Sequence, residues 1–336
     1  MIGTGDIMSE KDHGRIRFLD GWRGLAIIVV LIGHFAPGMS IAGGLGVDLF
    51  FVLSGRLMAQ ILVGERYPLK QFFIRRFTRI YPALLVFSTA MLIVSALARW
   101  KGIQSGSLIS PLDYFAALTM WMNYKVALLG DAGVLDHLWS ISVEEHCYII
   151  LAVLCAILAR RKTPVAFAVG AFAICAILNG FAQQAFSRGG EHEIFWRTDV
   201  RLAPLFMSFA VRLTSETTRK AMGMVSLPAL IAACIIPFTN FSLTAQLACA
   251  SVLLPIAVNG LDFAPTFARA AFELRAVQFM GVTSYSLYLW QQPFYRSQEK
   301  VSVLILLPLA ICCALASFYL IEGPARSYLN RRFGRS

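Results

Sequence analysis

Residues 19–34 read LDGWRGLAIIVVLIGH, and this stretch decides the fold class of the chain. Ten residues separate Arg23 from His34, and eight of them are aliphatic, so we expect a helix that enters a lipid bilayer. Eleven steps of about 100° return to within about 20° of the start, which predicts that Arg23 and His34 share one helix face, about 16 Å apart. Asp20 lies three residues before Arg23, where it can cap the helix or pair with that arginine.

His34 admits two interpretations. On a helix of a soluble protein, a histidine among apolar residues is most often a hydrogen-bonded core residue. Inside a membrane, ionisable side chains are rare and usually face the interior of the bundle or a water-filled cavity. We therefore favour a functional role for His34.

The composition places the whole chain in the membrane class. Of its 336 residues 57% are hydrophobic and only 15% are charged, whereas about a quarter of a soluble domain is charged. The mean hydropathy is +0.66. We expect an all-α, polytopic transmembrane bundle with no soluble domain. The net charge of +11 falls mostly in short loops, which indicates topology and contact with the anionic headgroups of the lipid bilayer, and we expect no nucleic acid partner.

Ten apolar segments are candidate membrane spans: residues 24–41, 46–63, 80–98, 138–159, 164–182, 200–214, 222–239, 243–259, 277–295 and 301–321. An eleventh segment, 112–130, is short and interrupted by Asn123 and Lys125. If it crossed the membrane, the basic cluster at 160–162 and all later loops would be inverted. We therefore expect 112–130 to be re-entrant or to lie in the outer interface.

The basic loops then predict that both termini are cytoplasmic. The expected organisation is a cytoplasmic N-terminal segment (1–18), a transmembrane domain (19–325) and a basic cytoplasmic tail (326–336). We expect no removable signal peptide, because the first 18 residues are polar. The seven cysteines all lie in apolar runs, so we expect neither a metal site nor a disulfide framework.

Charged residues recur in the next two segments. Asp48 and Arg56 are about two helical turns apart, so they could line the same cavity as His34, although Arg56 could equally extend its side chain to the membrane surface. Arg76 and Arg79 are neighbours on a helix surface and could clamp a phosphate, since guanidinium groups bind phosphate as a planar fork. The alternative for this pair is ordinary positive-inside anchoring.

The stretch HLWSISVEEHCY, residues 137–148, begins the fourth span and places several polar side chains at its outer end. Ser140 with Glu144 is close to a capping arrangement, which is the structural alternative. Two carboxylates and two histidines at a membrane border exceed what capping needs. We expect at least one glutamate to face the cavity.

Six motifs in this order resemble the acyltransferase-3 family of integral membrane acyltransferases. They are Arg-x10-His on the first helix, GVDLFFVLSG, the RFTR of an Arg-x-x-Arg motif, HLWSISVEEHCY, SYSLYLWQQP and IEGPAR. The resemblance runs from about residue 15 to residue 330. It implies transfer of an acyl group, usually acetyl, from cytoplasmic acyl-CoA to a hydroxyl of an extracytoplasmic or exported polysaccharide. It also implies a location in the bacterial inner membrane.

The resemblance assigns roles to individual residues. His34 matches the catalytic histidine, Arg23 its partner, and Asp20 an acidic position before that arginine. Arg76 and Arg79 match the Arg-x-x-Arg pair, where the phosphates of the co-substrate acetyl-CoA would rest. Glu144 matches the glutamate of the WSxSxE stretch. We add Asp48, Trp139, Ser140 and Trp196 as substrate-binding candidates, and expect no permanently bound cofactor.

Histidine suits this chemistry, because a sugar hydroxyl needs a base whose pKa is near neutral. Direct attack on the thioester with His34 as general base and an acyl-histidine intermediate both remain open, and Glu144 or Asp48 could orient the imidazole. Trp196, in the outer loop 183–199, could stack on a sugar of a glycan or glycolipid acceptor, or could belong to an aromatic belt.

Three positions depart from the family pattern. Gln291 stands where the family often has histidine, Gly323 where it often has arginine, and Arg56 where an apolar residue is common. We also expect no fused esterase-like domain. Alternative functions are acylation of a small molecule, such as a macrolide or a lipid-linked sugar, and polytopic transport. Transport is disfavoured, because the sequence has no internal repeats and no pairs of broken helices.

Overall fold

The computed structural model describes residues 17–186 and 191–333, and within these ranges every regular element is a helix. The predicted all-α class is therefore confirmed. Most of the expected cytoplasmic segment 1–18 and the last three residues of the tail lie outside the described residues. Residues 326–333 of that tail form the end of a helix that packs against the third span.

All ten apolar segments are helical. They form α1 (Arg17–Phe35), α2 (Ala42–Ala59), α3 (Leu69–Trp100), α6 (Trp139–Ile157), α7 (Lys162–Phe186), α10 (Ala203–Arg212), α11 (Glu216–Ile235), α12 (Leu243–Gly260), α14 (Arg275–Tyr295) and α15 (Val303–Ser317). π-Helical turns extend α2 over Gln60–Gly64 and join α15 to α16 (Gly323–Phe333). Eight helices of the described chain are long and apolar enough to cross a membrane. The two segments that fall short are α10, with 10 residues, and α14, which carries serine, tyrosine and glutamine side chains.

Residues 112–130 form two short helices, α4 (Pro111–Leu118) and α5 (Met122–Leu129). Each has eight residues and spans about 12 Å, far less than the roughly 30 Å of a bilayer core. Ser110 begins α4 with a capping box completed by Asp113. Asp113 also pairs with Lys125 of α5 at 2.6 Å, and both side chains are buried. This ion pair holds the two helices together.

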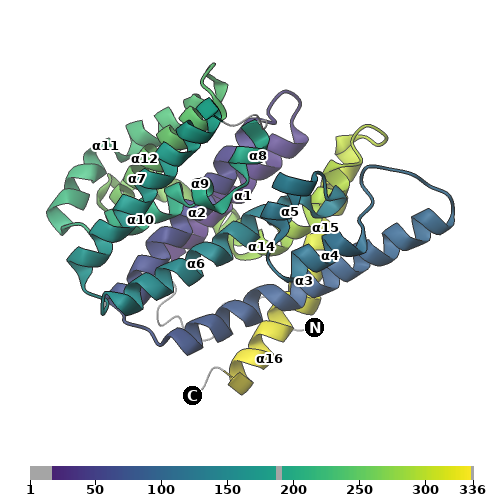
Figure 1. Ribbon diagram of the computed structural model, residues 1–336, viewed down its shortest axis with the longest axis horizontal. Coiled ribbons are helices and arrows are strands. Elements are labelled where there is room, and N and C mark those ends of the chain that lie inside the picture. The colour runs from purple at the N-terminus through teal and green to yellow at the C-terminus, as the bar shows by residue number, and fades with distance from the viewer. Residues whose placement is uncertain (1–16, 187–190, 334–336) are drawn as a thin grey trace.

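The centre of the molecule is the crossing of α1 with α14, and α1 also packs closely on α2 (Figure 1). Glycine makes this approach possible. A Cβ atom at Gly24 would collide with the carbonyl oxygen of Val277, and one at Gly281 would collide with that of Asp20. The two backbones are therefore in direct contact, and this contact fixes the first helix against the polar α14.

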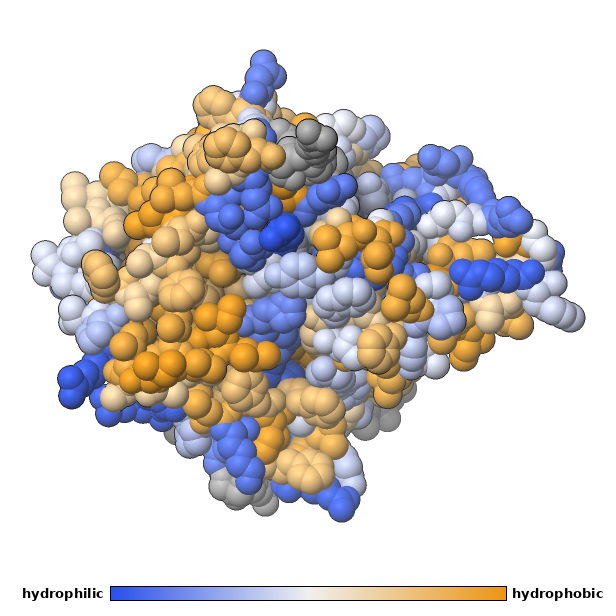
Figure 2. Space-filling model, in the orientation of Figure 1, coloured by the Kyte–Doolittle hydropathy of each residue, from blue (hydrophilic) through white to orange (hydrophobic). Residues whose placement is uncertain are grey.

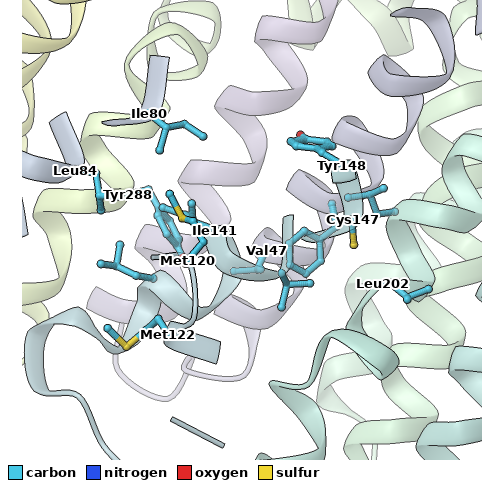
Figure 3. Close-up of a cluster of buried hydrophobic side chains, with 14 of the residues drawn as sticks. Val47, Ile80, Leu84, Met120, Met122, Ile141, Cys147, Tyr148, Leu202 and Tyr288 are labelled. Carbon is cyan, nitrogen blue, oxygen red and sulfur yellow. The ribbon is translucent and has the colours of Figure 1, made fainter. Parts of the chain in front are cut away.

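The remaining long helices surround this pair. In Figure 1, α7, α10, α11 and α12 lie to one side of α2, and α3 and α15 lie to the other. Figure 2 shows a broad apolar area over the first group, with polar side chains gathered above and below it. Large apolar side chains such as Phe167 on α7 and Leu304 on α15 are exposed, as expected where helices face lipid. Figure 3 shows part of the largest buried apolar cluster, which includes Tyr148 from α6 and Tyr288 from α14.

Candidate active site

A cavity of about 90 Å³, partly open to solvent, lies between α1, α2, α3, α6 and α14. We call it the central cavity. Its lining combines charged, hydroxyl and apolar groups: Arg23, Val47, Phe50, Phe51, Ser54, Leu57, Arg76, Arg79, Ile80, Ser140, Ile141, Glu144, Tyr148, Ser284, Tyr285 and Tyr288. Three predicted arginines and the predicted glutamate therefore meet at one place.

Arg76 is neutralised by carboxylates. Its Nη2 lies 2.7 Å from Glu144 Oε2, and its Nε donates to Glu145 Oε1 at 2.6 Å. The guanidinium also lies 4.3 Å from the centre of the Tyr148 ring. Glu144 accepts further hydrogen bonds from Ser54 and from the Tyr148 hydroxyl. The suggestion that Glu144 orients His34 is therefore wrong, because Arg76, Ser54 and Tyr148 occupy both carboxylate oxygens.

Arg79 lines the same cavity and has no hydrogen-bond or ion-pair partner among the described residues. An adjoining groove shares Arg76 and Arg79 with the central cavity and adds Arg75 and Arg326. Arg23 reaches the cavity from α1 and pairs with Asp20 at 3.4 Å. Because carboxylates neutralise Arg76, Arg79 is the arginine best placed to bind an incoming anion.

His34 lies outside the central cavity and contacts the later turns of α14. Its Nδ1 is 2.6 Å from Gln291 Oε1, and its ring stacks on Tyr295 with 4.3 Å between ring centres. Gln298 donates to the His34 carbonyl oxygen at 2.7 Å. In the sequence, Gln291 is noticeable only as a departure from the family pattern, and its contact with His34 was not predicted.

Gln291 fixes the tautomer of His34. The Gln291 amide nitrogen faces two acceptors, the Tyr288 carbonyl at 3.5 Å and Gln292 Oε1 at 3.2 Å, so its oxygen must face the imidazole. That oxygen can only accept, which puts the proton of neutral His34 on Nδ1. Nε2 then carries the lone pair. Nε2 and Cδ2 are the His34 ring atoms nearest Gly43, and a Cβ added at that glycine would lie 3.7 Å from each of them.

One face of α14 connects His34 to the central cavity. Ser284, Tyr288, Gln291 and Tyr295 are spaced by three or four residues, so they lie on one side of the helix. The first two line the cavity and the last two contact His34. The Tyr288 hydroxyl is held by Ser140 Oγ at 2.6 Å and by the His137 carbonyl at 2.7 Å. Ser284 and Gln291 are about 10 Å apart along the axis, which places His34 one to two turns beyond the cavity.

Comparison with known proteins identifies the family of this chain. The acyltransferase-3 family model, described as an acyltransferase domain, matches residues 16–322. This chain belongs to the acyltransferase-3 family. The resemblance seen in the six motifs is thereby confirmed.

Relatives of this acyltransferase-3 chain are named as O-acetyltransferases. A predicted peptidoglycan O-acetyltransferase of Bacillus subtilis is 26% identical over 365 residues, covering 97% of this chain and 57% of the relative. The peptidoglycan O-acetyltransferase of Listeria monocytogenes is 27% identical over 349 residues, covering 92% of this chain and 55% of the relative. The chain thus spans somewhat more than half the length of these curated relatives. No solved structure matches it.

In this acyltransferase-3 chain, Asp48 binds a different partner from the one expected. It pairs with Arg201 of α9 (Thr198–Arg201) at 2.9 Å, and both side chains are buried. The Arg201 guanidinium lies 4.0 Å from the ring centre of Phe195 and 5.1 Å from that of Trp139. Asp48 lines a separate groove between α2, α11 and α12. The predictions that Asp48 shares a cavity with His34 and could orient it are wrong, since Arg201 holds the carboxylate on another side of α2.

The other substrate-binding candidates are scattered. Ser140 lines the central cavity, and Trp139 packs beside Arg201. Trp196 is half-buried against the main core, and among the described residues it lines neither the central cavity nor the Asp48 groove. Arg56 does not face the cavity either, because it is buried and binds Asp262 through both carboxylate oxygens.

The tautomer assignment predicts different effects for two glutamines near His34. Gln291→Leu is expected to lower acyl transfer about 10- to 100-fold, because Nδ1 loses the acceptor that fixes the imidazole. Gln291→Glu keeps an acceptor oxygen and should retain more activity than the leucine variant. Gln298→Leu is the matched control, since Gln298 contacts only the His34 carbonyl. Equal losses in Gln291→Leu and Gln298→Leu would contradict the assignment.

Proposed function

We propose that this chain transfers an acetyl group from acetyl-CoA to a hydroxyl of a bacterial cell-surface glycan, with peptidoglycan as the acceptor suggested by the names of its relatives. The observation that carries the proposal is the contact of His34 with Gln291, which orients the imidazole on the same face of α14 that leads to an arginine-lined cavity. Family membership favours transfer over transport.

The donor side of the proposal rests on charge. Coenzyme A is strongly anionic, and the groove lined by Arg75, Arg76, Arg79 and Arg326 adjoins the central cavity. The phosphates of coenzyme A would bind in this groove, and the narrower thioester arm of the molecule would extend along α14 toward Tyr288. In the topology that the basic loops predict, this end of the bundle is cytoplasmic, where acetyl-CoA is made.

The chemical step uses His34 as a base. Nε2 removes the proton of an acceptor hydroxyl while its oxygen attacks the thioester carbonyl carbon. The new C–O bond forms, the C–S bond breaks, and the departing thiolate takes the proton from the imidazolium. In a two-step alternative, Nε2 attacks the thioester carbonyl carbon and the C–S bond breaks to release the thiolate. The acceptor oxygen then attacks the acetyl carbon, the C–N bond breaks, and the hydroxyl proton passes to the thiolate. His34 is not among the residues that line the central cavity, so either route requires the thioester to reach beyond that lining.

The decisive experiment measures ester-linked acetate on purified peptidoglycan and on secreted polysaccharide. Cells that carry the chain are compared with cells from which its gene is deleted. Acetate that depends on the chain in the peptidoglycan fraction would support the proposal. Unchanged acetate in both fractions, in cells without a second enzyme of this family, would contradict it.

Removal of the unpaired cavity arginine should weaken donor binding. Arg79→Gln is expected to raise the KM for acetyl-CoA about 10- to 100-fold with a smaller change in kcat, since a charge-assisted hydrogen bond to phosphate contributes about 1.5–3 kcal/mol. Arg99→Gln, at the far end of the same helix, is the matched control and should leave KM unchanged. The comparison requires kinetics of purified protein with a soluble acceptor. A KM for Arg79→Gln equal to that of the control would contradict the assigned role.

A further inference from the structure

A second group of arginines lies on the other side of α2 from the central cavity. It contains Arg56, Arg212 at the end of α10, Arg219 on α11 and Arg269 on α13 (Thr266–Glu273), gathered near Asp262. We call these five residues the Arg56 cluster.

Asp262 is the single carboxylate that these arginines contact among the described residues. Arg56 Nη2 donates to both of its oxygens, at 2.8 and 2.6 Å, and Arg56 Nη1 donates to the Val258 carbonyl at 2.6 Å. Arg212 lies 3.7 Å from the same carboxylate. Arg56 makes the closer contacts with this carboxylate, so Asp262 neutralises Arg212 only in part.

The other two guanidinium groups contact backbone oxygens. Arg219 donates to the carbonyls of Arg212 and Thr214, at 2.8 and 2.9 Å, and Arg269 reaches the Asp262 carbonyl at 3.5 Å. The Nε atoms of Arg56, Arg219 and Arg269 are buried and have no acceptor among the described residues. Four positive charges and one negative charge thus leave several N–H donors unused, which is costly unless an anion or a water molecule accepts their hydrogen bonds.

Two members of the cluster are partly exposed. The Arg212 and Asp262 side chains keep 23% and 28% exposure, so a ligand can reach both. The cluster is built from helix ends, at the end of the bundle where α2 leads toward the groove lined by Arg76 and Arg79. A basic cluster at helix ends is suited to lipid headgroup phosphates.

We propose that the Arg56 cluster binds a phosphate group, presented either by an anionic phospholipid or by free phosphate. Guanidinium groups bind phosphate oxygens as a fork, and Arg212 and Arg269 make the two longest contacts with Asp262, at 3.7 and 3.5 Å. The ligand would bind beside Asp262 and supply the acceptors that the cluster lacks. This site differs from the proposed donor groove, so its test does not depend on acetyl transfer.

The first experiment measures thermal unfolding of the purified full-length protein in detergent, with phosphatidylglycerol, phosphatidylcholine or inorganic phosphate added at matched ionic strength. Phosphatidylglycerol is expected to raise the Tm by about 5 °C relative to phosphatidylcholine, because ligand that binds only the folded state stabilises it. The double variant Arg212→Gln/Arg269→Gln should lose this shift. Arg331→Gln, an exposed arginine on α16, should keep it.

The two sources of phosphate are distinguished by which addition gives the variant-dependent shift. A shift with inorganic phosphate alone would assign free phosphate, and a shift with phosphatidylglycerol alone would assign the lipid. Equal shifts in all three proteins, or no shift in the wild type with either addition, would overturn the proposal.

Asp262→Asn should change the anion-induced rise in Tm in the opposite direction to the arginine variants. Removing the competing carboxylate leaves Arg56 without its partner, so the anion-induced rise in Tm should be larger in this variant than in the wild type. A role of the arginines in structure alone predicts only a lower Tm with no added response to phosphate. An unchanged or smaller anion response in Asp262→Asn would therefore also overturn the proposal.

Discussion

Replacing His34 by alanine is expected to lower acetyl transfer by about 10³-fold at an unchanged amount of folded protein in the membrane. General base catalysis by a positioned side chain contributes typically about 10²- to 10⁴-fold, and the contact with Gln291 positions the His34 imidazole. The cost to stability should be small, because the ring is lost from a contact with Tyr295 and Gln291 at the end of α1 and not from the middle of the core.

The measurement is ester-linked acetate on the cell-surface glycan, with membrane abundance of each variant determined in parallel. His34→Gln is the companion variant, since it keeps a polar side chain but cannot act as a base near neutral pH. Mass spectrometry of the wild-type protein after brief exposure to acetyl-CoA would distinguish the two routes, because an acetylated His34 is formed only in the two-step one. Transfer by His34→Ala within about twofold of the wild type would make His34 a structural residue.

Gly281→Ala is expected to destroy the packing of α1 against α14 and to remove most of the folded protein. The added Cβ would collide with the Asp20 carbonyl oxygen, and backbone atoms cannot move aside as a flexible side chain can. Overpacking in a close-packed interior typically lowers the free energy of unfolding by about 1–3 kcal/mol. A collision between a backbone atom and a Cβ atom should cost at least the upper end of this range.

Gly44→Ala is the matched control, because its Cβ would meet nothing within 4 Å. Size-exclusion elution and the Tm of the detergent-purified proteins provide the readout. We expect the control to behave as the wild type and Gly281→Ala to aggregate or to be absent from the membrane fraction. A monodisperse Gly281→Ala protein with the wild-type Tm would show that the α1 and α14 backbones are further apart than described.

The sequence was sufficient to predict the helices, because a bilayer leaves few ways to satisfy the hydrogen bonds of the backbone. Every apolar segment that was identified is helical, since lipid-exposed backbone must form its hydrogen bonds within the segment. The interruption by Asn123 and Lys125 correctly marked 112–130 as different, and the structure divides it between α4 and α5. Even α14, which is too polar for a simple span, could be identified by its length and position.

The sequence was not sufficient to predict which side chains contact one another. Helical periodicity says which residues share a face, but it does not say which of several neighbouring helices that face meets. Asp48 was therefore assigned to the cavity of His34, although it binds Arg201, 153 positions later in the chain. Gln291 was noted only as an unusual residue, because an amide that orients an imidazole has no local signature.

The hydrogen bond between His34 and Gln291 joins residues that are 257 positions apart, and this separation affects how the protein is made. A ribosome adds about 5–20 residues per second, so α1 waits in the membrane for about 10–50 s before α14 emerges. During that time its glycine face and its histidine lack their final neighbour. A nascent chain that stops short of α14 therefore lacks the side chain that orients His34.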